Sequence, residues 1–212
     1  MTGKLITIEG IEGAGKSTNL KVIENTLREA SIAFITTREP GGTLIAENIR
    51  KLLLEKGSEI IHEKTEVLLM FASRMQHLSQ VIEPALKKNI WVVCDRFTDA
   101  SYAYQGYGRG LDLSIISSLK DIVHPQINPD LTIVLDVPVK IAMDRVRKRG
   151  KLDRFEQENL NFFNKIRNGY KEIVKNNRNR CIPIDASKSI EVVEEAIRVS
   201  VMEFIKKQNY PG

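Results

Sequence analysis

The chain carries, near its start, the stretch Gly10-Ile11-Glu12-Gly13-Ala14-Gly15-Lys16-Ser17. A glycine, four free positions and Gly-Lys-Ser form the P-loop pattern, in which backbone N–H groups surround phosphate oxygens. An apolar run precedes this stretch and a segment with helical spacing follows it, so strand, loop and helix succeed one another as the motif requires. In such a loop Lys16 reaches the β- and γ-phosphates of a nucleotide, and Ser17 holds a magnesium ion. The sequence therefore predicts a nucleoside triphosphate site rather than a chance glycine-rich turn.

Length and composition are those of a soluble enzyme built as one α/β domain over residues 1–212. Hydrophobic residues make up 42% and charged residues 28%, which is ordinary for a globular protein. The net charge of +5 is spread along the chain, apart from residues 145–154, so a small anionic substrate explains it without a nucleic acid partner. Cys94 and Cys181 lie in apolar runs, as reduced cytosolic thiols do. No signal peptide or membrane-length apolar run is evident, so we expect a cytoplasmic protein without membrane contact.

Strand-like and helix-like segments alternate along the chain. Continuous apolar strands separated by helices indicate a parallel sheet covered on both faces, and with the P-loop this predicts a five-stranded P-loop NTPase fold. The expected strands cover residues 5–9, 33–37, 90–95, 131–137 and 181–185. The expected helices cover residues 16–29, 43–55, 63–88, a segment from about 140, 156–175 and 190–207. We expect Thr43 to cap its helix, and Pro84 to kink or end the long one.

Ligands of such sheets bind beyond the carboxyl ends of the strands, where two aspartates compete for a metal-side role. Asp95 ends the apolar run 91–94, and Asp136 ends another, so both have the form of a Walker B carboxylate. We favour Asp95, because Arg96 follows it and an adjacent Asp-Arg pair suits a metal ion beside a phosphate. Asp136 precedes Val-Pro, which is typical of a strand-to-helix turn.

Three further segments predict contacts to a second substrate. Residues 38–43 read Arg-Glu-Pro-Gly-Gly-Thr: Arg38 is able to clamp an anion, and Pro40 is compatible with a cis or a trans bond. On the long helix, Met70 and Phe71 share a face with Arg74, which suits a nucleobase but also a core stripe with a snorkelling arginine. Residues 99–110, rich in Tyr and Gly, suit a nucleoside wall or a surface loop.

The densest positive run covers residues 145–154. It fits a solvated helix end, a nucleic acid patch or a phosphate lid, and other basic clusters or stacking platforms that would favour nucleic acid are not evident. Transfer of a phosphoryl group needs cations on the moving phosphate, and the free P-loop positions supply no arginine. We therefore expect Arg149 or Arg154, on a short mobile lid over about 147–155, to supply that charge.

Together these motifs resemble the thymidylate kinase family of P-loop nucleoside monophosphate kinases, in its bacterial form. The resemblance runs from Ile6 to about Asp185. Its most specific parts are residues 9–17, 37–43, 95–97, 103–106 and 149–154. It implies an enzyme that phosphorylates dTMP to dTDP with Mg-ATP, in dTTP biosynthesis, and a homodimer formed through helices beside the acceptor site.

The resemblance also implies roles for individual residues. ATP would be bound by Gly10, Ile11, Glu12, Gly13, Ala14, Gly15, Lys16, Ser17 and Thr18, and dTMP by Glu12, Arg38, Pro40, Met70, Phe71, Arg74, Arg96, Ser101, Tyr104 and Gln105. Catalysis would involve Lys16, Asp95, Arg96, Arg149 and Arg154, and Mg²⁺ would be held by Ser17 and Asp95. The family commonly has an aromatic residue four positions before the base-binding arginine. Met70 stands there in this chain, with Phe71 next, so the residue that covers the base stays open between them.

Other functional classes fit less well. A P-loop kinase for nucleosides needs a base for a hydroxyl proton and gives no reason for both Arg38 and Arg96 near the acceptor. A GTPase needs an Asn/Thr-Lys-x-Asp element, and the one Lys-x-Asp of this chain, at 151–153, follows Gly150. A non-catalytic nucleotide-binding or DNA-binding module is the least favoured. An assay of ADP release with each nucleoside monophosphate separates these classes.

Overall fold

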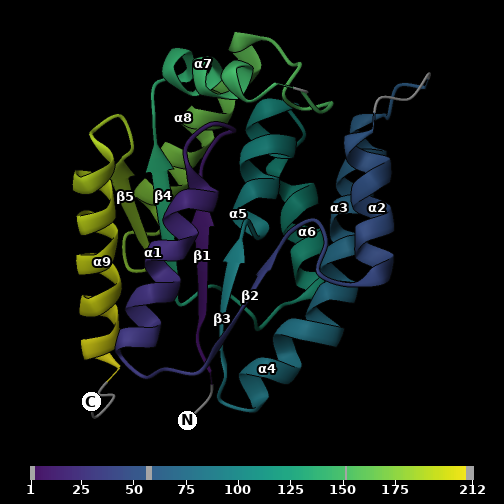
Figure 1. Cartoon of the computed structure of the whole chain (residues 1–212). Coiled ribbons are helices and arrows are strands. Elements are labelled where there is room, and N and C mark those ends of the chain that lie inside the picture. The colour runs from purple at the N-terminus through teal and green to yellow at the C-terminus, as the bar shows by residue number, and fades with distance from the viewer. Residues whose placement is uncertain (1–2, 56–58, 151, 209–212) are drawn as a thin grey trace.

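The fold is a parallel sheet between two layers of helices (Figure 1), seen in a computed structural model that describes residues 3–55, 59–150 and 152–208. The predicted P-loop NTPase architecture of five parallel strands is confirmed. The strand order is β2-β3-β1-β4-β5, with bounds β1 (Leu5–Glu9), β2 (Phe34–Arg38), β3 (Trp91–Asp95), β4 (Leu131–Asp136) and β5 (Cys181–Asp185). These bounds lie within one residue of the predicted ones.

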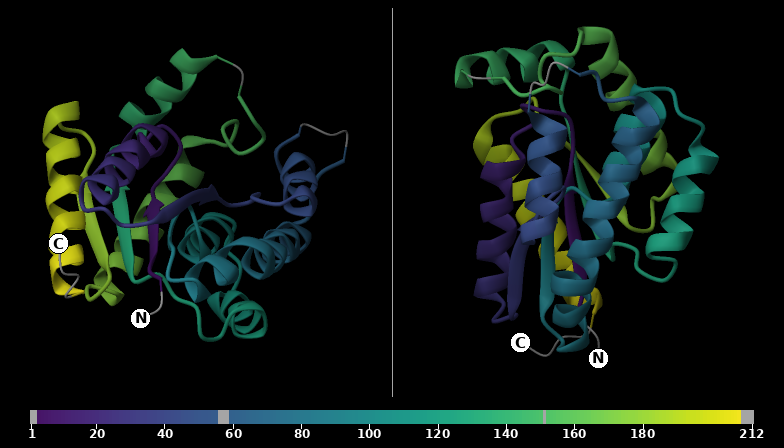
Figure 2. Two further views of the ribbon diagram at one scale, coloured as in Figure 1. Left: turned by 60° about the horizontal axis from the view of Figure 1, so that its bottom comes forward. Right: turned by 90° about the vertical axis from the view of Figure 1, so that its right-hand side faces the viewer.

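Helices cover both faces of the sheet, as predicted. Helices α1 (Lys16–Glu29) and α9 (Ile190–Lys207) pack together on one face, and α8 (Leu160–Asn176) packs on the other against the turn η2 (Tyr102–Gly108). Figure 2 shows α7 (Val139–Arg149) lying across the carboxyl edge of the strands. All side chains of β1 are buried, because a central parallel strand faces helices on both sides. No helix within the described ranges has the length and apolar character to cross a membrane.

The long predicted helix over 63–88 is helical throughout but not uniform. It consists of α3 (Glu63–His77), a π-helical turn η1 (Leu78–Ile82) and α4 (Glu83–Lys87). Pro84 lies in the first turn of α4, where its missing N–H removes little hydrogen bonding. The predicted boundary at this proline is therefore present. The predicted cap of α2 (Leu44–Leu54) is present too, since the Thr43 hydroxyl accepts the Ala46 N–H.

Four details of the chain differ from the prediction. The basic residues 147–149 belong to the last turn of α7 and not to a loop. Helix α8 starts at Leu160 rather than 156, because Asp153 and Glu156 bond each other's backbone N–H groups and form a separate turn. Helix α6 (Leu113–Val123) was not predicted, although Asp112 caps it. The segment 99–110 is no surface loop, because α5 (Thr98–Ser101) and η2 are helical and largely buried.

Parallel pairing brings the strand ends to one edge of the sheet. Ile8 pairs with Asp95, and Arg38 with the same residue from the other side. Asp136 pairs with Asp185 at the other end of that edge. The P-loop, the segment after β2 and the segment after β3 therefore adjoin one another, which is the condition for a shared site.

Candidate active site

One cleft of about 640 Å³ opens at the carboxyl edge of the sheet. Its walls come from the P-loop, from the segments that follow β2 and β3, from helix α3 and from the end of α7. Most of the predicted site residues line it, namely Glu12, Gly13, Gly15, Lys16, Ser17, Thr18, Pro40, Met70, Arg74, Asp95, Arg96, Ser101, Tyr104, Gln105 and Arg149. The predicted residues that do not line it are Gly10, Ile11, Ala14, Arg38, Phe71 and Arg154. Lys151 of the predicted lid lies outside the described residues.

The P-loop has the backbone that its glycines permit. Gly13 and Gly15 have φ values of 74° and 93°, a left-handed region that favours glycine. A Cβ on Gly13 would lie 2.1 Å from the carbonyl oxygen of Ala142 in α7, so the loop and this helix are in close contact. Lys16 Nζ donates to the carbonyls of Gly10 and Ile11, at 3.1 and 3.2 Å. Burial, and next the charge of Arg96, lower the pKa of Lys16 to about 8.

Arg96 joins the P-loop to the side of the cleft that is formed by η2. Its backbone is left-handed, with φ 70°. Its guanidinium donates to the Gly10 carbonyl and to the Glu12 carboxylate, both at 2.9 Å, and lies 4.8 Å from the centroid of the Tyr104 ring. The Tyr104 hydroxyl donates to the other Glu12 oxygen at 2.5 Å. Glu12, a free position in the P-loop pattern, is therefore fixed by two residues from outside the loop.

Glu9 is fully buried at the end of β1, beneath this arrangement. It accepts the Phe97 N–H at 2.7 Å and the Tyr170 hydroxyl at 2.8 Å. Burial, and next the charge of Asp99, raise the pKa of Glu9 to about 8. The side chain is thus largely protonated at neutral pH, and it holds the segment after β3 by hydrogen bonds rather than by an ion pair.

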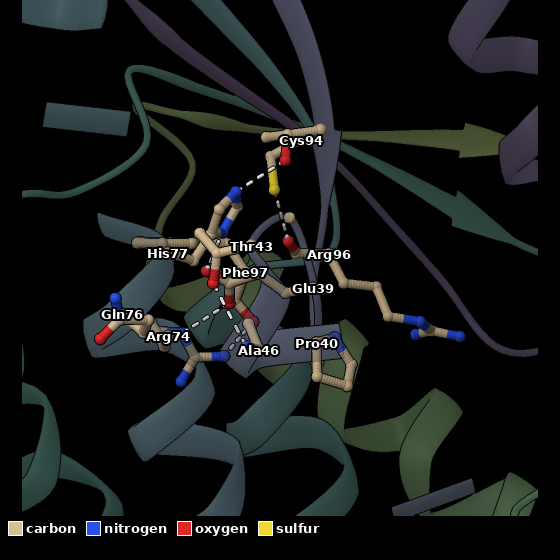
Figure 3. A network of polar contacts seen from close by, with 12 residues as sticks. Glu39, Pro40, Thr43, Ala46, Arg74, Gln76, His77, Cys94, Arg96 and Phe97 are labelled. Carbon is tan, nitrogen blue, oxygen red and sulfur yellow. Dashed lines mark hydrogen bonds and ion pairs between the residues drawn. The ribbon is translucent and has the colours of Figure 1, made fainter. Parts of the chain in front are cut away.

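The segment after β2 supports the end of the cleft that is formed by α3 (Figure 3). Its Glu39–Pro40 bond is cis, which answers the question that the sequence left open. Glu39 is buried and accepts Arg74 Nε at 2.7 Å, and it also bonds His77 Nδ1 at 3.1 Å. Burial opposes ionisation of Glu39, but Arg74 and His77 outweigh it and lower its pKa. Glu39 therefore fixes the plane of the Arg74 guanidinium.

Arg74 has further partners across the cleft. It donates to the Ser101 hydroxyl and to the Phe97 carbonyl, both at 3.1 Å. Phe71 is buried, and its ring centroid lies 4.6 Å from the Arg74 guanidinium carbon. Met70 lines the cleft and Phe71 does not. Of the two candidates, the structure places Met70 where a ligand would touch it.

Asp95 and Asp136 were the two predicted candidates for a metal-binding carboxylate, and their surroundings differ. Asp95 lines the cleft, and its Oδ1 atom is buried without a hydrogen-bond partner in the described parts of the chain. Asp136 is held by two bonds from Arg167, at 2.5 and 3.0 Å, and it borders a separate cavity of about 200 Å³. Of the two, Asp95 is the carboxylate with an oxygen that no described residue bonds.

Like Arg74 and Arg96, the other three predicted arginines hold protein carboxylates. Arg38 bonds both oxygens of Glu47, at 2.9 Å. Arg149 pairs with Glu156, yet its side chain is 63% exposed at the rim. Arg154 bonds the buried Glu66 at 2.7 Å and the Leu53 carbonyl. The structure therefore places Arg154 among side chains beside the cleft, not in its lining.

The sequence reasoning missed two arginines of the cleft. Arg50 on α2 donates to the Pro40 carbonyl and lines the cleft near Arg96. Arg145 on α7 donates to the carbonyls of Gly13 and Ala186, between the P-loop and the segment after β5. Arg145 belongs to the basic run that was predicted as a whole. The sequence signal for Arg50 was weaker. It consisted only of the position of Arg50 three residues after Glu47, on the same face of one helix.

Comparison with known proteins identifies the family of the chain. The family model for thymidylate kinase matches residues 8–197. A thymidylate kinase from Teredinibacter turnerae is 48% identical over 205 residues, which are 97% of this chain and 100% of that protein. The chain belongs to the thymidylate kinase family. The resemblance inferred from the five sequence motifs is thereby confirmed.

Other thymidylate kinases agree in sequence and in fold. The protein from Ectopseudomonas mendocina is 54% identical over 170 residues, which are 80% of this chain and 81% of that one. The crystal structure of a thymidylate kinase from Ehrlichia chaffeensis matches with a TM-score of 0.75 at 32% identity, covering 97% of this chain and all of that one. The arrangement of strands and helices is therefore that of a solved thymidylate kinase.

The pKa of Glu9 leads to a prediction for stability. A carboxyl group whose pKa is about 4.5 when unfolded and about 8 when folded stabilises the fold below pH 4.5. This contribution is lost as the pH rises through 8. Glu9→Gln, which keeps an acceptor for Phe97 and a partner for Tyr170, should remove that loss. Thermal unfolding from pH 5 to 8.5 should show the wild type falling relative to the variant.

Glu203→Gln is the matched control, because Glu203 is exposed and has no side-chain contact in the described structure. Its Tm should follow the wild type at each pH. Parallel curves for Glu9→Gln and the wild type would contradict the assignment of a raised pKa to Glu9.

Proposed function

We propose that the cleft holds ATP and dTMP together, and that this is how the chain carries out the reaction of its family. The chain phosphorylates dTMP to dTDP, a step of dTTP synthesis, and it is a kinase. One observation carries the proposal: the P-loop and the Arg74–Gln105 region line a single cleft, and Arg96 bonds the first and stacks on Tyr104 of the second. We also propose that the described ranges act as one kinase domain.

The acceptor nucleoside lies between α3 and η2 in this proposal. Arg74 and Gln105 face the thymine edge, Met70 covers the ring, and Ser101 orients Arg74 through its hydrogen bond. Tyr104 closes the sugar end, since its hydroxyl is held by Glu12, and it disfavours a 2′-hydroxyl there. The side chains around this nucleoside site are polar on one side and apolar on the other, as nucleoside sites require.

The chemistry is positioning and charge stabilisation. The acceptor phosphate is already anionic and attacks the γ-phosphate in line, so no strong base is needed. Lys16 and the P-loop N–H groups bind the ATP phosphates, and Arg96 stands where the two phosphate chains meet. Arg50 adds positive charge in the lining, and Arg38 and Arg149 would add theirs on leaving Glu47 and Glu156. These cations offset the repulsion between two anions.

Mg²⁺ is the expected metal, and the residues present fit it. Asp95 offers a buried oxygen without a partner among the described residues, and the Ser17 hydroxyl lines the same cleft. No cluster of three or more His, Cys, Asp or Glu side chains in those residues would hold a metal alone. Mg²⁺ suits such a sparse set, because it is usually held by one or two protein ligands with water and phosphate oxygens. When bound, it neutralises charge on the ATP phosphates.

Two wider properties complete the proposal. We propose that the protein works in the cytoplasm, where both nucleotides occur. We also propose a homodimer formed through α2 and α3, which pack side by side. Ile45 and Leu52 on α2, and Leu68 and Met75 on α3, are exposed apolar side chains seven residues apart. That spacing places each pair on one face of its helix.

Substrate choice tests the function directly. Release of ADP from Mg-ATP is measured with each nucleoside monophosphate in turn and with thymidine. Turnover should be highest with dTMP and negligible with thymidine, which lacks the phosphate that Arg96 and its neighbours would hold. A maximum with dCMP, UMP or AMP would overturn the assigned acceptor.

Arg96→Ala tests the central residue of the mechanism. The variant should keep its fold and lose about 100-fold or more in kcat, because the lost cation stabilises charge in the transition state. Arg178→Ala is the matched control, since Arg178 is exposed and has no side-chain contact in the described residues. Turnover of Arg96→Ala near the wild-type rate would exclude this role.

Light scattering coupled to gel filtration tests the homodimer. With 24.0 kDa per chain, the proposal expects about 48 kDa, twice 24.0. Leu68→Asp, which puts a charge on the exposed α3 face, should shift the mass towards 24 kDa. A wild-type mass of one chain would refute the homodimer.

A further inference from the structure

Glu66 on α3 is the most heavily bonded carboxylate beside the acceptor site. Its side chain is 1% exposed, and it accepts Gln105 Nε2 at 2.8 Å and Arg154 Nη2 at 2.7 Å. Arg109 also pairs with it, at 3.3 Å. The two arginines come from different segments: Arg109 lies at the end of η2, and Arg154 lies in the turn after α7. Neither the sequence motifs nor the proposed mechanism gave Glu66 a role.

The bond to Glu66 decides how the Gln105 amide is oriented. An amide has one end that donates and one that accepts, and a carboxylate only accepts. The Glu66 oxygens accept from Arg109 and Arg154 as well, and Gln105 turns its NH₂ group towards them. The carbonyl oxygen of Gln105 then faces the other way. Gln105 lines the cleft, and no donor among the described residues contacts that oxygen.

Arg74 provides a donor close to this acceptor. A guanidinium has five N–H groups, and three are used by Glu39, Ser101 and Phe97, which leaves 5 − 3 = 2. Ser101, which Arg74 bonds, lies four residues before Gln105 on the α5–η2 helical segment. Arg74, Ser101 and Gln105 all line the cleft, so the remaining Arg74 donors and the Gln105 carbonyl belong to one wall of it.

A donor beside an acceptor matches one kind of pyrimidine edge. Thymine and uracil present the O4 acceptor next to the N3–H donor, whereas cytosine presents the N4–H₂ donor next to the N3 acceptor. With Gln105 held as described, cytosine would set its N3 lone pair against the Gln105 carbonyl. If the amide turned over, its NH₂ group would instead donate to N3 of cytosine.

We propose that Glu66 is a positioning residue for base specificity: it holds the Gln105 amide in the orientation that accepts thymine and rejects cytosine. The proposal rests on the proposed function, since it assumes that the acceptor base lies against Arg74 and Gln105. It also gives Arg154 a task in the acceptor site, because Arg154 bonds the Glu66 carboxylate and holds it in place.

The variant Glu66→Gln tests this proposal, because glutamine has nearly the same side-chain shape as glutamate. A glutamine at position 66 can offer either an acceptor or a donor to Gln105, so the Gln105 amide is free to turn over. The ratio of kcat/KM for dTMP to that for dCMP should fall by about tenfold or more, the effect of one mismatched buried hydrogen bond. The ratio of dTMP to dUMP should stay constant, because both bases present the same edge.

Glu158→Gln is the matched control. Glu158 pairs with Arg109 in the same cluster but does not contact Gln105, so its loss should leave the ratio of dTMP to dCMP unchanged. If Glu66 served only to stabilise the fold, Glu66→Gln would lower activity with both nucleotides by one common factor. An unchanged ratio would therefore overturn the proposal.

NMR of the ¹⁵N-labelled wild type gives a second test that does not depend on a variant folding. One side-chain N–H proton of Gln105, assigned by its loss in Gln105→Leu, should be shifted downfield and slow to exchange with water. A solvent-like signal would overturn the proposal. Failure of the wild type to phosphorylate dTMP would instead refute the proposed function, so the two failures are distinguishable.

Discussion

The contact of Arg96 with the P-loop is the constraint on which the cleft depends. Its guanidinium bonds the Gly10 carbonyl and the Glu12 carboxylate, and it lies against Tyr104. A left-handed backbone at a residue other than glycine costs on the order of 1–3 kcal/mol, so the surrounding contacts must hold Arg96 in place. They bring the donor loop and the acceptor wall to a fixed separation, which phosphoryl transfer between two nucleotides requires.

Three buried carboxyl groups hold backbone and side-chain groups of the cleft in place by hydrogen bonds. Glu9 holds the segment after β3 through Phe97, Glu39 holds Arg74, and Glu66 holds Gln105. Burying such groups is costly unless they are hydrogen-bonded, and each of them has at least two partners. Glu9 and Glu66 do not line the cleft, whereas Glu39 forms part of its wall. Their common effect is to fix the orientation of groups that do line the cleft, so that little reorganisation is needed when ligands bind.

Local sequence signals predicted the sheet and the P-loop, because glycine conformations and apolar strands are encoded within short stretches. The roles of Ser101, Tyr104 and Gln105 followed from the family resemblance. Interrupted local patterns and contacts between distant residues were not predicted. Helix α6 was missed although Asp112 marks its start, since serines interrupt its apolar pattern. The start of α8 was displaced because Glu156 bonds the preceding turn. Arg154 was predicted to lie over ATP. Only the folded chain shows that it donates a hydrogen bond to Glu66, which is far away in sequence.

The central claim is that both nucleotides lie end to end in one cleft around Arg96. The most direct test is the binding of a single compound in which adenosine and thymidine are joined through a polyphosphate chain. Titration calorimetry should give a tighter affinity for it than for ATP or dTMP alone, and each nucleotide should compete with it. Displacement by ATP alone, with dTMP still binding to the occupied protein, would contradict a shared cleft.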